Sequence, residues 1–181
     1  MTKLTTNPPL YFDTDCLSAF LWIENESILT QLYPGRVIIP KQVYDELSSV
    51  PRLQGRIDTL LGRNEVELLE IEADTPAAEL YAELTGSPRP GHTVIGRGEA
   101  ASLALSKTFN GIVASNNLRD ITQYIEEYQL QHKTTGDILI EALDAGIITE
   151  QIGNSLWSNM LRRRRWLGAP SFTDFLRQKG R

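Results

Sequence analysis

The sequence predicts an α/β fold in which a parallel β-sheet is flanked by helices. Short apolar runs alternate along the chain with longer segments of helical periodicity, a pattern typical of this fold class. The chain of 181 residues is 41% hydrophobic, which is enough for one compact domain with its own core. Its one cysteine, Cys16, excludes a disulfide framework and is expected to be a buried, reduced thiol.

The first half of the chain is expected to contribute three strands. The first spans residues 10–12 and ends at Asp13, and one helix after it carries the apolar residues from Leu17 to Leu32 before Pro34 and Gly35 end it. We expect the second strand at residues 36–40, helices at 41–49 and 52–62, and the third strand at 66–71.

The second half is expected to complete the sheet. Thr75 is placed to cap a helix that begins at Pro76, and the Gly- and Pro-rich segment 86–98 is expected to be a loop over one end of the sheet. The remaining expected elements are a helix at 99–109, a strand at 112–114, a helix at 118–128, a strand at 131–134 and a helix at 136–145 that Gly146 ends. Residues 149–181 are expected to be a helical extension packed on a domain formed by residues 1–148.

Charge is distributed unevenly along the chain. Residues 161–181 hold seven of the 18 Lys and Arg and one of the 23 Asp and Glu, which leaves 11 basic against 22 acidic residues in positions 1–160. The body is therefore acidic and the C-terminal segment basic. Residues 1–10 lack the apolar core of a signal peptide, and no apolar run has the length of a membrane span. We expect a cytoplasmic protein with no membrane partner.

Acidic residues follow or flank the predicted strands. Asp13 follows the first strand and is not expected to begin a helix, whereas Asp15 either caps the next helix or belongs to a site. On the helix after the second strand, Glu46 lies about 60° from the buried Val43, whereas Asp45 lies about 160° away and should be solvated. Glu46 therefore borders the core.

A third acid, Glu99, begins a helix that is apolar over most of its circumference. A carboxylate in such a first turn is favoured by the helix dipole, bound to another group, or both. The preceding Gly96-Arg97-Gly98 matches neither a phosphate-binding loop nor a dinucleotide fingerprint, so we reject a nucleotide cofactor. The fourth strand ends in polar residues that either cap the next helix or face the same site: Ser115, Asn116, Asn117, Arg119 and Asp120.

Carboxylates from these distant segments are expected to meet at one edge of the sheet, beyond the carboxyl ends of the strands. Acids gathered in one cleft repel one another, and hard cations such as Mg²⁺ or Mn²⁺ relieve the repulsion. Such an ion activates water and offsets charge in phosphoryl chemistry. Zinc is not expected, because the chain has no His or Cys cluster.

Five segments in this order resemble PIN domains, especially the VapC-like branch: YFDTDCLSAF, RVIIPKQVYDEL, GRGEAASLALS, GIVASNNLRDI and GDILIEALDAGIIT. The resemblance covers about residues 9–148. It implies a three-layer α/β/α sandwich with a central parallel sheet and a Mg²⁺- or Mn²⁺-dependent endoribonuclease, often the toxin of a toxin–antitoxin pair. It further implies hydrolysis that leaves a 5′ phosphate, an RNA substrate, an antitoxin partner and a homodimer.

The resemblance also implies roles for individual residues. Asp13, Glu46 and Glu99 match the first three acids of the family. The fourth acid is replaced by Asn116 and Asn117, with Asp120 nearby, and this set is expected to complete the catalytic and metal-binding group, with Asn117 as its catalytic member. Thr14, Asp15 and Ser115 are expected to fix the ligands or a phosphate.

Arginines are the expected RNA contacts. The run Arg162, Arg163, Arg164 and Arg165 precedes Trp166, so guanidinium groups that pair with phosphates stand beside an indole that can stack on a base. The same run could instead be favoured by a helix dipole or bind an acidic partner. Arg97 and Arg119 stand closer to the proposed site.

Two other functions remain open. Asp13-Thr14-Asp15 after a strand is also found in haloacid-dehalogenase-type phosphatases, but that family expects Thr or Val where Leu17 stands. Alternatively, the absence of the fourth acid indicates a catalytically impaired PIN fold that binds RNA or a protein partner.

Overall fold

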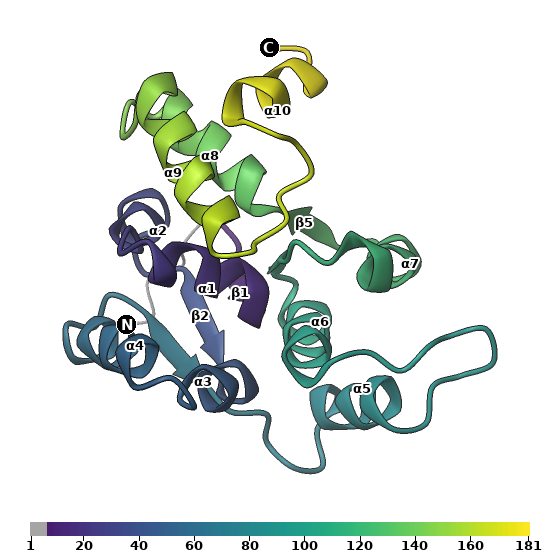
Figure 1. Cartoon of the computed structure of the whole chain (residues 1–181). Helices are drawn as coiled ribbons and strands as arrows, with labels where there is room; N and C mark the ends of the chain where they lie inside the picture. Colours follow the sequence, from purple (N-terminus) through teal and green to yellow (C-terminus); the bar gives the residue numbers. More distant parts are fainter. Residues whose placement is uncertain (1–6) are drawn as a thin grey trace.

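A five-stranded parallel sheet forms the centre of the molecule in the computed structural model, which describes residues 7–181 (Figure 1). The part of the N-terminal prediction that concerns residues 1–6 lies outside the described residues. The strand order is β3-β2-β1-β4-β5, with every neighbouring pair parallel. The strands are β1 (Leu10–Phe12), β2 (Val37–Pro40), β3 (Glu67–Leu69), β4 (Ile112–Ala114) and β5 (Gln131–Lys133).

The order of the strands creates a crevice at the centre of the sheet. The chain runs from β1 outwards through β2 to β3 and then returns to the other side of β1 to form β4 and β5. Phe12 of β1 pairs with Ala114 of β4 at the point where the direction reverses. In open α/β sheets, ligands bind beyond the carboxyl ends of the strands at such a reversal.

Alternate residues of the strands bury against different helical layers, which confirms the predicted three-layer α/β/α sandwich. Leu10 and Phe12 belong to a core packed by seven helices: α1 (Thr14–Trp22), α2 (Ser27–Leu32), α3 (Lys41–Leu47), α4 (Pro51–Gly62), α8 (Thr135–Asp144), α9 (Glu150–Arg162) and α10 (Phe172–Gln178). Tyr11 packs on the opposite face with α5 (Pro76–Thr85), α6 (Arg97–Phe109) and α7 (Leu118–Tyr128). The short helix α3 (Lys41–Leu47) follows β2 directly.

The prediction of one helix from Leu17 to Leu32 is wrong, because α1 ends at Trp22 and α2 begins at Ser27. Glu24 adopts φ 58°, and the Asn25 N–H donates to the Phe20 carbonyl at 3.0 Å, which closes the end of α1. The turn brings Glu26 within 2.7 Å of Arg56 on α4. No Gly or Pro marks this break in the sequence.

Other boundaries differ by one or two residues. Helix α6 begins at Arg97, not at Glu99, because the Glu99 carboxylate accepts the Gly96 N–H at 2.9 Å and thereby satisfies a donor at the start of the helix. The predicted cap Thr75 is confirmed, and so is the left-handed Gly146, at φ 70°.

Cys16 is free and fully buried, and burial raises the pKa of its thiol.

The C-terminal helices share the core of the first face. Trp157 of α9 is fully buried, donates its indole N–H to the Ala169 carbonyl at 3.0 Å and packs against Phe172 and Phe175. A Cβ added at Gly153 would lie 2.3 Å from the Phe172 ring, so only glycine permits this approach. A Cβ added at Gly136 of α8 would lie 2.4 Å from the Phe175 ring, so residues 149–181 also pack on the rest of the chain, while the division at residue 148 stays a prediction.

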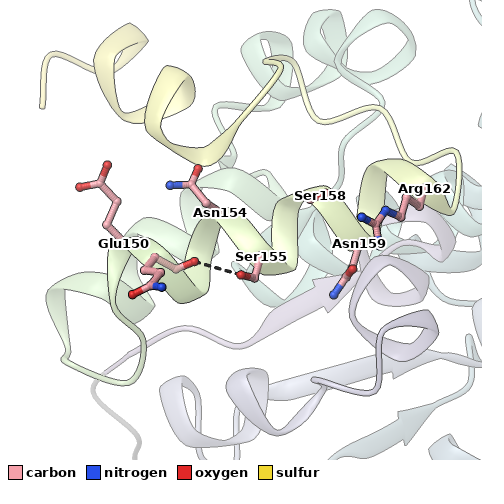
Figure 2. A pocket seen from close by; sticks show the side chains of 7 residues that line it. Glu150, Asn154, Ser155, Ser158, Asn159 and Arg162 are labelled. Carbon is pink, nitrogen blue, oxygen red and sulfur yellow. Dashed lines mark hydrogen bonds between the residues drawn. The ribbon is translucent and has the colours of Figure 1, made fainter.

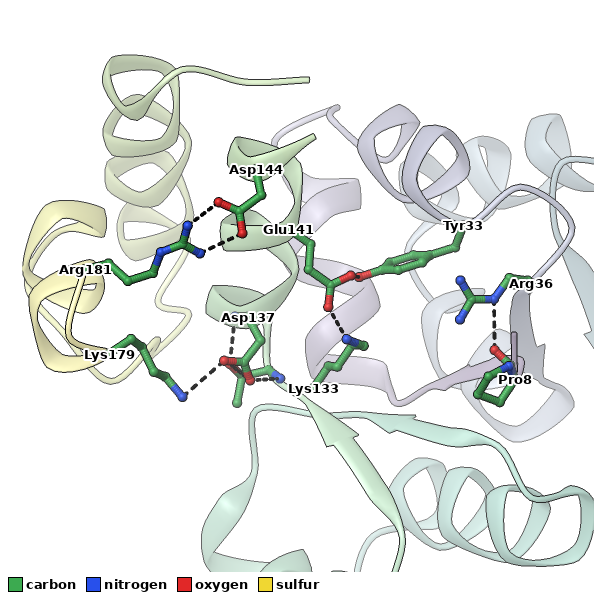
Figure 3. A network of polar contacts seen from close by, with 10 residues as sticks. Pro8, Tyr33, Arg36, Lys133, Asp137, Glu141, Asp144, Lys179 and Arg181 are labelled. Carbon is green, nitrogen blue, oxygen red and sulfur yellow. Dashed lines mark hydrogen bonds and ion pairs between the residues drawn. The ribbon is translucent and has the colours of Figure 1, made fainter. Parts of the chain in front are cut away.

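Ion pairs fasten the end of the chain to α8 (Figure 3). Lys179 lies 3.1 Å from Asp137, and Arg181 binds both carboxylate oxygens of Asp144. Within residues 7–181 no helix combines the length and the apolar character that crossing a membrane requires.

Candidate metal centre

Asp13 lies at the reversal point of the sheet. Its N–H donates to the Ala114 carbonyl at 2.9 Å, and one carboxylate oxygen, Oδ1, accepts the Cys16 N–H at 2.8 Å. Asp13 is thus the N-cap of α1, contrary to the expectation that it begins no helix, because α1 starts directly after the strand. Asp15, the alternative cap, lies exposed in the first turn.

The second carboxylate oxygen of Asp13 has no partner. Asp13 is only 1% exposed, and its Oδ2 is buried without a hydrogen bond within the described part of the chain. Burial raises the pKa of Asp13 to about 7, and repulsion from Asp15 and Glu99 adds to this. The Cys16 amide and the Ser115 hydroxyl, which lies nearby without completing a hydrogen bond, act in the opposite direction. A buried, unpaired carboxylate is costly unless a proton or a cation joins it.

Glu46 reaches the same place from α3. Its Oε2 accepts the Thr14 hydroxyl at 2.5 Å. Gly98 of α6 lies against this pair, since a Cβ there would stand 2.6 Å from Thr14 Oγ1 and 3.6 Å from Glu46 Oε2. Asp45 turns away and pairs with Lys41 in solvent, as the helical wheel predicts. Three segments of the chain therefore meet at Thr14.

Glu99 is fixed at the other side of the site. One of its oxygens accepts the Gly96 N–H, and the other accepts the side-chain amide of Asn117 at 2.6 Å. The same Asn117 nitrogen donates to Asp120 at 2.8 Å. Asn117 thus presents its NH₂ group to two carboxylates and holds them together without neutralising their charge.

These residues line one cavity of about 220 Å³. Its lining is Asp13, Thr14, Asp15, Glu46, Gly96, Gly98 and Glu99. The sequence-predicted acids are therefore brought together, although within residues 7–181 no three His, Cys, Asp or Glu side chains are already gathered around one point as metal ligands. Glu46 and Glu99 are instead turned toward Thr14, Gly96 and Asn117.

The donor set fits a hard divalent cation. Every candidate ligand in the cavity offers carboxylate oxygen, which Mg²⁺ and Mn²⁺ prefer, and one of them, Asp13, has an unpartnered oxygen. Asp13, Glu46 and Glu99 are the residues that could hold such an ion.

Two residues predicted near the site have structural contacts. Both polar atoms of Asn116 bind Thr135, since Oδ1 accepts its N–H and Nδ2 donates to its hydroxyl, each at 2.8 Å. Asn116 therefore fastens β4 to the start of α8 and does not face the cavity. Buried Ser115 accepts the Asn117 N–H at 3.1 Å and so positions the residue that binds Glu99.

The arginines predicted to contact RNA lie in different places. Arg162 borders a polar hollow along the outer face of α9 (Figure 2), and Arg163 lies over the Trp22 ring. Only Arg165 of the four-arginine run reaches the site, through Asp15 at 3.1 Å. Arg97 is exposed and donates to the Tyr81 hydroxyl at 3.2 Å, while Arg119 is exposed at the start of α7.

The hollow along α9 is larger, at about 620 Å³, but its lining holds one carboxylate, Glu150, and no buried charged side chain (Figure 2). The smaller cavity at the reversal point is therefore the better candidate for chemistry. Sequence reasoning missed Gly96 and Gly98 as parts of that cavity. Their position within three residues before an acid at a helix start was the available signal.

Comparison with known proteins shows the family of the chain. The family model described as DUF3368, PIN domain, matches residues 10–181. The chain belongs to the PIN-domain family. PIN domains are generally nucleases that use divalent metals. A search among curated proteins gave no match.

Among solved structures, a chain of the DNA-bound VapBC complex from Salmonella typhimurium is 18% identical with a TM-score of 0.51, over 71% of this chain and 98% of that chain. A chain of VapBC2 from Rickettsia felis, bound to a DNA fragment from their promoter, is 16% identical with a TM-score of 0.49, over 69% and 98%. The predicted PIN membership is confirmed, and the first structure shares the predicted VapC-like fold.

Proposed function

We propose that this PIN domain is a Mg²⁺- or Mn²⁺-dependent endoribonuclease. The observation that carries the proposal is the buried Asp13 carboxylate, whose Oδ2 lacks a partner at the reversal point of the sheet. Family membership supports nuclease chemistry in general. RNA as the substrate and a role as the toxin of a toxin–antitoxin pair, with an antitoxin partner and a homodimeric state, rest on the resemblance to VapC-like proteins.

Asp13, Glu46 and Glu99 would hold the ion. A divalent cation bound there supplies Lewis acidity that lowers the pKa of water and offsets charge on the phosphate. Thr14 orients Glu46 by donating its hydroxyl, and Gly98 leaves room for that contact. Asn117 and the Gly96 N–H orient Glu99. The chain thereby restrains two flexible glutamates, while the cap of α1 restrains Asp13.

The decisive variant is Asp13→Asn. It removes the charge of the buried ligand but keeps an oxygen that can cap α1. We expect cleavage of single-stranded RNA in Mg²⁺ or Mn²⁺ to fall by at least about a hundredfold, measured with a fluorophore–quencher RNA. Asp45→Asn is the matched control, because Asp45 lies beside Glu46 in sequence yet pairs with Lys41 in solvent. Full activity in Asp13→Asn would refute the assignment.

A second candidate is a PIN fold that binds RNA or a protein without cleaving. The orientation of Asn117 favours it, because this residue offers donors to Glu99 and Asp120 at the place where the resemblance expects a fourth acid. Calorimetric titration with Mn²⁺ separates the two candidates. The nuclease proposal requires that the wild type binds Mn²⁺ and that Asp13→Asn does not. The impaired fold requires no Mn²⁺ binding.

A further inference from the structure

A second cavity lies beside the candidate metal centre. It has a volume of about 460 Å³, within the range of roughly 300–1,000 Å³ common for small-ligand sites. The start of α7 forms one wall, and residues 166–168 with α10 form the other. Its lining includes Asn117, Leu118, Arg119, Trp166, Phe175 and Lys179, and no acidic residue lines it.

Two contacts connect this cavity to the metal centre. Asn117 lines it and donates to Glu99, which lines the metal-centre cavity. Arg165, the neighbour of Trp166 in sequence, pairs with Asp15, which also lines the metal-centre cavity. The two cavities are therefore neighbours, joined by residues in direct contact.

Trp166 presents an unoccupied aromatic surface. The indole is 73% exposed, whereas Trp157 is fully buried and Trp22 lies under the Arg163 guanidinium. Within residues 7–181 no aromatic, cationic or hydrogen-bonding group is found on the Trp166 ring. Leu118 adds a second exposed apolar side chain, at 47%, to the same cavity. Exposed apolar surface that lines a cavity is typical of a binding site.

The cavity also offers one uncompensated cation. Lys179 is held by Asp137 (Figure 3), but Arg119 forms no ion pair with any acid in the described part of the chain. A flat apolar surface beside an unpaired guanidinium suits a ligand that is aromatic at one end and anionic at the other. A nucleotide has that chemistry, because bases stack on indoles and phosphates pair with arginine.

We propose that this cavity, formed by Leu118, Arg119 and Trp166, binds one unpaired nucleotide of the strand that crosses the metal centre. The base lies on the Trp166 indole and its phosphate pairs with Arg119. This subsite rests on the proposed function for the identity of the strand as RNA and for its course across the metal centre. An aromatic side chain of a protein partner would use Trp166 and Leu118 but would leave Arg119 without a partner.

Binding to a short oligouridylate RNA in chelator tests the subsite without cleavage. We expect the RNA to quench intrinsic fluorescence of the wild type but not of Trp166→Phe, since Trp157 is fully buried and the half-buried Trp22 lines neither cavity. In fluorescence anisotropy with dye-labelled RNA, the dissociation constant of Trp166→Ala should be roughly tenfold higher than that of the wild type. The dissociation constant of Trp166→Phe should stay close to the wild-type value. Duplex RNA, whose bases are paired, should bind more weakly.

The logarithm of the dissociation constant rises with the logarithm of salt concentration. In Arg119→Gln the slope of this line should be smaller by about the amount that one phosphate contact contributes. Arg63→Gln is the matched control, because Arg63 ends α4, which Figure 1 shows at the opposite edge of the sheet. Unchanged affinity in Trp166→Ala, or equal affinity for duplex RNA, would overturn the subsite. Quenching by an aromatic peptide but not by RNA would assign the cavity to a protein partner.

The binding assay and the cleavage assay fail separately. Binding that depends on Trp166 without any cleavage in Mn²⁺ would remove the nuclease proposal and keep the subsite. The converse result is that cleavage is lost in Asp13→Asn while RNA binding is unchanged in Trp166→Ala. That result would keep the nuclease proposal and remove the subsite.

Discussion

Acidic side chains at two ends of the molecule have different partners. On α8 the three acids Asp137, Glu141 and Asp144 each have a cation, since they pair with Lys179, Lys133 and Arg181 respectively (Figure 3). At the reversal point, Asp13, Glu46, Glu99 and Asp120 bind only neutral donors and form no ion pair with residues 7–181.

The difference indicates what each set of acids does. Paired acids at the surface contribute little free energy and mainly fix the docking of α10. Acids that the fold brings together without cations carry an electrostatic cost, and a protein tolerates that cost where a ligand removes it. Asp15 stands between the two types, because it lines the metal-centre cavity and yet pairs with Arg165.

The largest expected effect concerns pH. Burial raises the pKa of Asp13 from 3.8 to about 7, so between these values the folded state binds the proton more tightly than the unfolded state. The stabilisation from that proton is present below pH 4 and is lost as pH rises through 7. In chelator at pH 8, Asp13→Asn should therefore exceed wild type in unfolding free energy by up to about 4 kcal/mol.

That advantage of Asp13→Asn should shrink as the pH falls toward 4, and urea unfolding at several pH values measures it. Comparing the two proteins removes contributions from other groups, such as His132, whose pKa burial lowers. If the difference in unfolding free energy between the two proteins did not vary with pH, the prediction would be wrong. Asp13 would then carry a charge that other groups of the metal-free fold stabilise.

The next effect is stabilisation by metal. Mn²⁺ at about a hundred times its dissociation constant should stabilise the wild type by about 3 kcal/mol, a rise in Tm of roughly 5–10 °C for a chain of this size. Asp13→Asn should lose the rise, whereas Asp144→Asn, which only breaks the exposed pair with Arg181, should keep it. An equal rise in Tm in all three proteins would contradict the prediction, because it would mean that Mn²⁺ stabilises the fold without binding to Asp13.

The smallest effect concerns the support of Glu46. In Gly98→Ala the new methyl group would displace the Thr14 hydroxyl from Glu46, and Mn²⁺ affinity should fall roughly tenfold. Gly55→Ala is the matched control, because a Cβ at this position of α4 meets nothing within 4 Å. It should leave Mn²⁺ affinity unchanged and stabilise α4 by up to about 1 kcal/mol. Equal affinities in the two variants would remove Gly98 from the site.

The three central strands could be predicted because they are short, apolar and buried. Leu10–Phe12 and Ile112–Ala114 are the predicted strands, and Thr75 and Gly146 mark helix ends by their own conformational preferences. The break between α1 and α2 could not be predicted, since Glu24 takes its left-handed conformation in a fold that places it beside Arg52 and Arg56 of α4.

The candidate site was predictable in its acids but not in their contacts. Asp13, Glu46 and Glu99 were chosen from their positions after strands and on helix faces, and they line one cavity. The opposite orientations of Asn116 and Asn117 depend on Thr135 and Glu99, which lie far away in sequence. The predicted group of four arginines also separates, because α9 ends within it.

The packing of α10 has a consequence for biosynthesis. Phe172 and Phe175 fill spaces that glycines at 136 and 153 leave for them in α8 and α9, and both rings contact Trp157. The ribosome makes these phenylalanines after every residue that they pack against. The core around Trp157 therefore closes only after residues 172–176 have been synthesised, later than every strand of the sheet.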